Sequence, residues 1–222
     1  MQKFNYTYAP RHVGLMKEQI WEAKQDLQVY SDLSLFEFEQ IEPFLGSPKV
    51  VLEVGSGLGR GSIFLNSILQ DDTVHYVLAD RTGMTNNTGA FAPESDEFYN
   101  DLEQTAEFAR INGLENLRTF DTEADNWSDL PKADLIFSLC SFGMHVSIER
   151  YIDRLIATAT PRCTMIFGTR GPYGRTSFSN LFENVVFLPG KESKGRFPRE
   201  DWLILQNPIA AIAANEISAH AE

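Results

Sequence analysis

The sequence contains few cysteines and no long apolar run. Cys140 and Cys163 are the only two Cys among its 222 residues. Two thiols are too few for a disulfide scaffold or a Cys-based zinc site. No apolar run reaches the length of a membrane span, and residues 1–14 lack the apolar stretch of a signal peptide. We therefore expect a cytoplasmic protein without a membrane partner.

Basic residues are also scarce relative to acidic ones. There are 19 Lys and Arg against 31 Asp and Glu, which gives a net charge of −12. Phosphate backbones attract proteins with basic surfaces, and the densest basic stretch, residues 191–200, carries Glu residues as well. We expect no nucleic-acid partner.

Strand and helix patterns alternate along residues 49–170. Hydrophobic residues make up 43% of the chain, enough for a sizeable core. The alternation predicts an α/β fold with a parallel sheet covered on both faces. We predict strands at 49–55, 75–80, 117–122, 133–140 and 163–170, and a closing pair at 184–190 and 202–207. We predict helices at 14–30, 33–45, 61–69, 95–113 and 147–159.

We interpret residues 1–222 as one domain. Residues 1–47 would form an N-terminal helical cap, and residues 48–222 would form the ligand-binding core. Residues 81–94 form a long polar loop, and such loops are typically functional or disordered. In parallel sheets, ligands bind at the carboxyl ends of the strands, near the switch in strand order.

The most informative stretch is VVLEVGSGLGRGSIF, residues 51–65. Gly55, Gly57 and Gly59 remove the Cβ atoms that would keep a ligand away from the backbone, and Gly also permits a tight strand-to-helix turn. The spacing is G-x-G-x-G, whereas a dinucleotide site has G-x-G-x-x-G. Glu53 would repel a pyrophosphate and suits a cationic ligand such as an ammonium or sulfonium group. This points to S-adenosylmethionine.

Two further acids end predicted strands. Asp80 ends the second strand, where a carboxylate can accept hydrogen bonds from ribose hydroxyls. Asp121 ends the third strand and could accept from an adenine amino group, with Thr122 in support. For each acid alone, a helix cap or a turn is the simpler reading.

The segment LEVGSGLGRG resembles the glycine loop of class I S-adenosylmethionine-dependent methyltransferases, and the resemblance covers about residues 49–170. It implies a Rossmann-like three-layer αβα fold whose seven-stranded, mostly parallel sheet has an antiparallel last strand. It also implies that Gly55, Gly57 and Gly59 wrap the methionine part of S-adenosylmethionine and that Asp80 holds the ribose. The predicted cofactor site also includes Ser56, Arg81 and Leu139.

A narrower resemblance concerns the methyl acceptor. EFYNDLEQTAEFARINGLENL and FSLCSFGMHVSIERYIDRL are similar to segments of bacterial proteins proposed to be sugar O-methyltransferases, although Phe142 stands where Trp is frequent. This implies transfer to a hydroxyl of a small molecule, a sugar or a glycosylated metabolite. His145 follows the fourth strand and is the candidate catalytic base; a helix cap or loop packing is its alternative.

Several alternatives stay open. An N- or C-methyltransferase on a small metabolite needs no general base. An NAD-binding oxidoreductase would need the third Gly one position later, and a non-catalytic subunit could keep the fold. Because SLCSFGMH contains no carboxylate, we expect no metal. The tail carries Ile209, Ile212 and Ile217 on a potentially helical stretch, which leaves a homodimer open.

Overall fold

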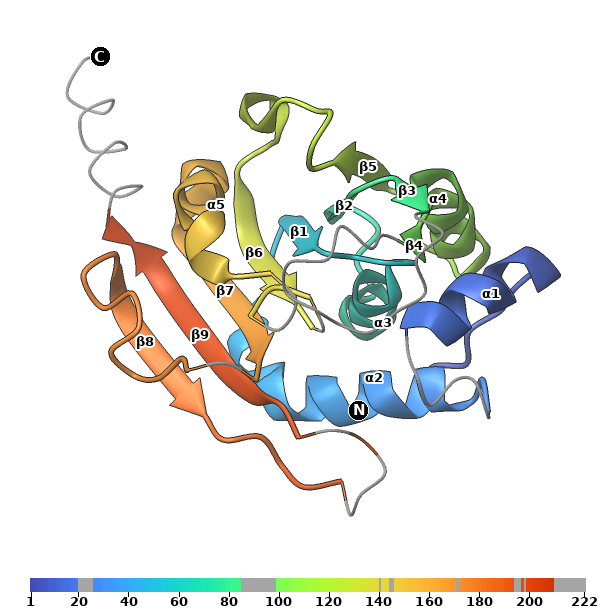
Figure 1. Cartoon of the computed structure of the whole chain (residues 1–222), viewed down its shortest axis with the longest axis horizontal. Coiled ribbons are helices and arrows are strands. Elements are labelled where there is room, and N and C mark those ends of the chain that lie inside the picture. Colours follow the sequence, from blue (N-terminus) through green and yellow to red (C-terminus); the bar gives the residue numbers. More distant parts are fainter. Residues whose placement is uncertain are drawn as a thin grey trace.

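The computed structural model describes residues 1–19, 26–84, 99–139, 141–143, 146–170, 172–193, 197 and 199–209. Its centre is a seven-stranded sheet in the order β5-β2-β1-β6-β7-β9-β8 (Figure 1). The strands are β1 (Val50–Val54), β2 (His75–Asp80), β5 (Leu117–Asp121), β6 (Ala133–Ser138), β7 (Ala159–Thr169), β8 (Phe182–Leu188) and β9 (Asp201–Pro208).

The sheet has the predicted direction pattern. β1 pairs in parallel with both β2 and β6, β2 pairs in parallel with β5, and β6 with β7. β9 runs antiparallel to both of its neighbours, β7 and β8. The prediction of a mostly parallel sheet with an antiparallel last strand is confirmed. The strand order reverses between β1 and β6, so their carboxyl ends form the switch point.

Helices cover both faces of the sheet (Figure 1). One apolar cluster joins α1 (Pro10–Gln19), α2 (Val29–Ile41), α3 (Arg60–Leu69) and α4 (Leu102–Ile111) to one face. A second cluster joins α5 (Ile152–Thr158) to the other face. This is the predicted three-layer αβα arrangement.

The central strands are apolar on both faces, as expected for a covered parallel sheet. In β1, Val51 belongs to the cluster under α3, and Leu52 and Val54 belong to the cluster under α5. This explains why the strand is a continuous apolar run in the sequence rather than an alternating one.

Four of the five predicted helices have the wrong bounds. α2 begins at Val29 rather than at 33, and α5 begins at Ile152 rather than at 147. Residues 26–28 form a turn between α1 and α2, so one helix over 14–30 is wrong. α4 begins at Leu102, because Asp101 accepts hydrogen bonds from the amides of Glu103 and Gln104 and caps it. Upstream, β3 (Gly83–Met84) and β4 (Tyr99–Asn100) form a small antiparallel sheet where we expected loop and helix. The 3-10 helices η2 (Glu42–Phe44), η3 (Trp127–Asp129) and η4 (Ile148–Arg150) complete the elements of the described ranges.

The N-terminal residues pack tightly on α2 and α4. Tyr6 stacks on Phe108 of α4 and meets Tyr30 of α2 edge to face, and all three are buried. The aromatics of this region therefore serve packing. Among the described residues, no helix has the length and apolar character needed to cross a membrane.

Candidate functional site

The glycine turn links β1 to α3 and has the conformation that the sequence predicts. Gly55, Gly57 and Gly59 all have positive φ angles, of 64°, 54° and 77°. A Cβ at Gly55 would lie 2.2 Å from Cβ of Ser141, and one at Gly59 would lie 2.9 Å from Leu78 Cδ1. The turn therefore needs Gly for both its dihedral angles and its close approaches.

Glu53 does not point into open space. Its Oε2 accepts a hydrogen bond from the amide of Ser62 at 2.9 Å, in the first turn of α3. Burial raises the pKa of Glu53 to about 7, against the opposing effects of Ser62 and of the nearby Arg60 charge. The carboxylate thus neutralises the positive end of the helix dipole. The same carboxylate explains why residue 61 is a glycine, because a Cβ at Gly61 would lie 2.7 Å from Glu53 Oε1.

Asp80 is tied to the same turn. Its Oδ2 accepts from the amide of Gly57 at 2.7 Å, and its Oδ1 accepts from the amide of Arg81 at 2.8 Å. Burial raises the pKa of Asp80 to about 6, and the two amide bonds oppose this shift. The structure therefore brings the predicted ribose-binding acid and the predicted methionine-binding turn into direct contact.

Asp121 lies beside Asp80, since the two are paired in the register of β2 and β5. Its Oδ1 accepts from the amides of Glu123 and Ala124, and its Oδ2 accepts from the amide of Thr82 at 3.3 Å. The carboxylate thus holds a turn, which is the simpler of its two readings. A role toward an adenine stays a prediction.

The remaining predicted cofactor residues surround the same switch point. The amide of Ser56 donates to the Ala79 carbonyl and the amide of Thr122 to the Asp80 carbonyl, which joins the turn to β2 and β2 to β5. Leu139 is buried next to α3, because a Cβ at Gly61 would lie 2.9 Å from its Cδ1. Arg81 follows Asp80 at the strand end.

A buried ion pair adjoins the turn and was not predicted. Arg60, the first residue of α3, donates to both carboxylate oxygens of Glu37 on α2, at 2.5 and 3.1 Å. Arg60 Nη1 also donates to Ser34 Oγ, and the Tyr6 hydroxyl donates to the Arg60 carbonyl. Glu37, Arg60 and Ser34 are buried. This network fixes Tyr6 and α2 against the start of α3.

A further carboxylate, Glu200, lies near this pair. Its Oε1 accepts from Arg170 Nη2 at 2.9 Å. Burial raises the pKa of Glu200 to about 7, the Glu37 charge adds to the shift, and Arg170 and Arg60 oppose it. Arg170 follows directly on the last residue of β7. It is half-exposed and ion-paired.

His145, the predicted base, lies outside the described residues, as does Cys140. Cys163 is buried in β7, where burial raises the pKa of its thiol above the ordinary range. Among the described residues, no group of three or more His, Cys, Asp and Glu side chains is placed to hold a metal ion.

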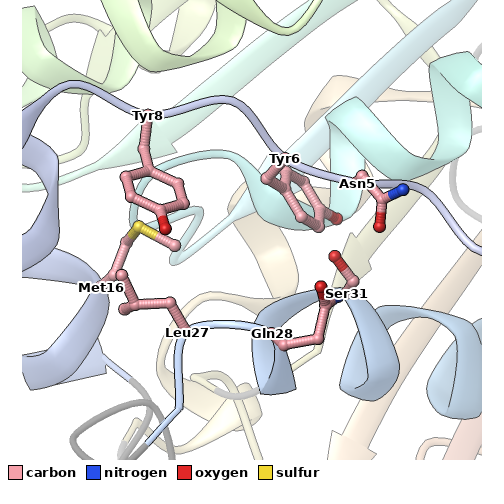
Figure 2. Close-up of a pocket in the computed structure, with 7 residues that line it drawn as sticks. All are labelled: Asn5, Tyr6, Tyr8, Met16, Leu27, Gln28 and Ser31. Atoms are coloured by element: carbon pink, nitrogen blue, oxygen red, sulfur yellow. The ribbon is translucent and has the colours of Figure 1, made fainter.

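A small cavity of about 140 Å³ lies between the N-terminal residues and the helices α1 and α2 (Figure 2). Its lining residues are Asn5, Tyr6, Tyr8, Met16, Leu27, Gln28 and Ser31. Sites for drug-sized ligands usually have about 300–1,000 Å³. This cavity is too small for a nucleoside cofactor.

No family model matches the chain, and no curated protein sequence matches it. A proposed O-methyltransferase from Klebsiella pneumoniae is similar in structure, with a TM-score of 0.56, 13% identity, and coverage of 90% of this chain and 91% of that one. An S-adenosylmethionine-dependent methyltransferase from Aquifex aeolicus has a TM-score of 0.52 at 15% identity, over 90% of this chain and all of that one.

The chain has the class I methyltransferase fold. A proposed O-methyltransferase from Nostoc punctiforme also shares this fold, with a TM-score of 0.55 at 12% identity over 84% of this chain. The chain spans only 60% of the length of the Nostoc protein. At these identities the likeness shows the fold alone, so activity and substrate depend on the residues of the site.

Proposed function

We propose that the protein is an S-adenosylmethionine-dependent methyltransferase that transfers a methyl group to a hydroxyl of a small molecule, a sugar or a glycosylated metabolite. The choice of S-adenosylmethionine as cofactor is supported by one observation: amide N–H groups at the glycine turn and at the start of α3 already donate to carboxylates of the protein. The amides of Gly57 and Ser62 are held by the carboxylates of Asp80 and Glu53. Free amides at a helix start are what a pyrophosphate needs.

The charges of the site support the same choice. Glu53 and Asp80 both lie at the turn, and a dinucleotide would bring its phosphates against them. A sulfonium and an ammonium group, in contrast, are attracted by these carboxylates. Each carboxylate oxygen of Asp80 has two lone pairs, and among the described residues each accepts a hydrogen bond from one backbone amide. Asp80 can therefore accept further hydrogen bonds from a ligand. The site therefore fits a cation that carries a ribose.

The chain's own residues would perform the binding and orientation. The bare backbone at Gly55 and Gly57 would receive the amino-acid part of the ligand, and Asp80 would accept from the ribose hydroxyls. Bound S-adenosylmethionine supplies an electrophilic methyl group. The protein's remaining task is to hold the acceptor in line and to remove its proton.

The acceptor class is supported by sequence resemblance. Residues 97–117 and 137–155 are similar to segments of proteins proposed to act on sugars, and the sequence alone offers His145 as the candidate base. We further propose a cytoplasmic protein with a small-molecule acceptor. The test is incorporation of labelled methyl from S-adenosylmethionine into a panel of nucleotide sugars, glycosides and amine-bearing metabolites. Methylation of the amines alone would contradict the hydroxyl assignment.

A further inference from the structure

Glu200 lies at the same edge of the sheet as the glycine turn. It immediately precedes β9, which runs antiparallel to β7, and the register pairs Asp201 with Thr169, the last residue of β7. The start of β9 is therefore level with the carboxyl end of β7. In a parallel α/β sheet this is the edge at which ligands bind.

Gly168 of β7 lies between Glu200 and the residue that follows β6. A Cβ at Gly168 would lie 2.3 Å from the carbonyl oxygen of Leu139 and 3.2 Å from Glu200 Oε2. Gly168 thus lets Glu200 approach the end of β6. The Leu139 side chain also borders the start of α3, so Leu139 lies near both Glu200 and the helix that follows the glycine turn.

One oxygen of Glu200 has no assigned role. Oε1 is held by Arg170, but Oε2 is buried and, among the residues that the structure describes, has no hydrogen-bond partner. The whole side chain is only 7% exposed. A buried carboxylate oxygen without a donor is costly, so its retention calls for a functional explanation.

We propose that Glu200, rather than His145, is the general base, and that its Oε2 takes the proton of the acceptor hydroxyl. This inference rests on the proposed methyltransferase function. The acceptor oxygen forms a bond to the methyl carbon with its own electron pair, and the carbon–sulfur pair stays on sulfur. The O–H proton moves to Oε2, which leaves a methyl ether, a neutral thioether and a protonated Glu200.

The surroundings of Glu200 suit this role. Three charged residues face Glu200: Glu37 from α2, Arg60 from α3 and Arg170 from the end of β7. Burial and the Glu37 charge raise the pKa of Glu200 to about 7. A base with a pKa near the working pH combines a useful ionised fraction with sufficient basicity. Arg170 holds the carboxylate through the other oxygen, so Oε2 is presented in a fixed orientation.

The test compares Glu200→Gln with Glu37→Gln, since both remove one buried carboxylate charge from the same cluster. Glu200→Gln should bind S-adenosylmethionine with a dissociation constant within about threefold of the wild type. Its initial rate with the best hydroxyl compound of the panel should fall about 100-fold or more, and the acidic limb of the pH–rate profile should disappear. Glu37→Gln should keep that limb and shift it to lower pH, because the Glu37 charge raises the pKa of Glu200.

Two results would overturn the inference. The first is a Glu200→Gln variant that binds S-adenosylmethionine and keeps both the wild-type rate and the acidic limb of the pH–rate profile, while His145→Gln loses that limb. The other comes from infrared difference titration, which needs no acceptor: the acid carbonyl band of Glu200, identified by its loss in Glu200→Gln, should vanish near neutral pH. A Glu200 that stays ionised from about pH 5 to 9 contradicts the proposal. If the wild type does not bind S-adenosylmethionine at all, the proposed function itself fails.

Discussion

The amide of Gly57 donates to the carboxylate of Asp80 across 2.7 Å, which makes the glycine turn after β1 and the acid at the end of β2 one physical unit. In a protein with this fold, the unit joins the proposed contacts for the methionine and ribose parts of one ligand.

Gly59→Ala should lower both stability and cofactor affinity. The substitution forces Ala to a φ of 77° and brings its Cβ to 2.9 Å from Leu78 Cδ1. The matched control is Gly46→Ala, at a φ of 60° but with no atom within 4 Å of the added Cβ. Both should lose about 1–2 kcal/mol of unfolding free energy from the left-handed conformation, measured by urea titration. Only Gly59→Ala should also weaken binding of S-adenosylmethionine. If the two variants bind S-adenosylmethionine equally well, the assignment of the glycine turn to the cofactor site is contradicted.

Thr105→Val should loosen the turn from α4. The Thr105 hydroxyl donates to the Gly57 carbonyl at 2.7 Å and also lies 3.0 Å from the Asp101 carbonyl. Its control is Thr158→Val, another buried helical Thr, whose hydroxyl bonds only to carbonyls within α5. Each variant should lose about 1 kcal/mol of stability. Calorimetry should show weaker cofactor binding for Thr105→Val and unchanged binding for Thr158→Val. A loss of affinity in both would indicate a general effect.

Glu53→Gln should stabilise the protein at alkaline pH. Because the folded-state pKa is about 7 and the ordinary value is 4.5, the folded state holds a proton that the unfolded state releases between these pH values. The contribution of Glu53 to stability therefore falls as pH rises from about 4.5 to 7 and stays unfavourable above that. At pH 8 the variant should gain about 1–3 kcal/mol, and near pH 4.5 the difference should vanish.

Urea unfolding as a function of pH tests this sign, with the exposed Glu115→Gln as control. A Glu53→Gln variant that is less stable than the wild type at pH 8 would mean that the carboxylate charge stabilises α3 by more than its burial costs. The same variant should bind S-adenosylmethionine more weakly, since it removes a negative charge from the site.

Glu37→Gln should destabilise the N-terminal cap. The variant removes the carboxylate that accepts two hydrogen bonds from the buried Arg60 guanidinium. Breaking a buried ion pair in this way typically lowers the free energy of unfolding by about 3–5 kcal/mol. Glu53 and Glu200 remain near Arg60, so we expect a loss toward the lower end. The double variant Glu37→Gln with Arg60→Met should be more stable than Glu37→Gln alone. Additive losses in this double-mutant cycle would show that the pair is not coupled.

The sequence predicted most of the sheet because its strands are local apolar runs. β2 has the predicted bounds, and the turn after β1 follows from three Gly residues that no other side chain can replace. Helix starts were predicted less well. The helix predicted to begin at 95 begins at Leu102, because Asp101 is the residue that caps it. Several polar residues near a helix start can serve as caps, and local patterns alone do not choose between them.

The buried charges could not be predicted for a different reason. Glu37, Arg60 and Glu200 come from α2, α3 and the start of β9, and only the packing of the cap on the sheet brings them together. Each of them alone reads as an ordinary surface charge. The orientation of Glu53 toward Ser62 likewise depends on how closely α3 approaches β1, which Gly61 permits.

The most direct test of the central claim is calorimetric titration with S-adenosylmethionine and with NAD, on the wild type, Asp80→Ala and Asp134→Ala. Asp134 is a matched control, because its carboxylate accepts from the amides of Lys49 and Val50 at the opposite edge of the sheet. We expect saturable binding of S-adenosylmethionine but not of NAD, weakened about tenfold or more by Asp80→Ala and unchanged by Asp134→Ala. Binding of NAD in place of S-adenosylmethionine, or affinity that does not depend on Asp80, would contradict the account.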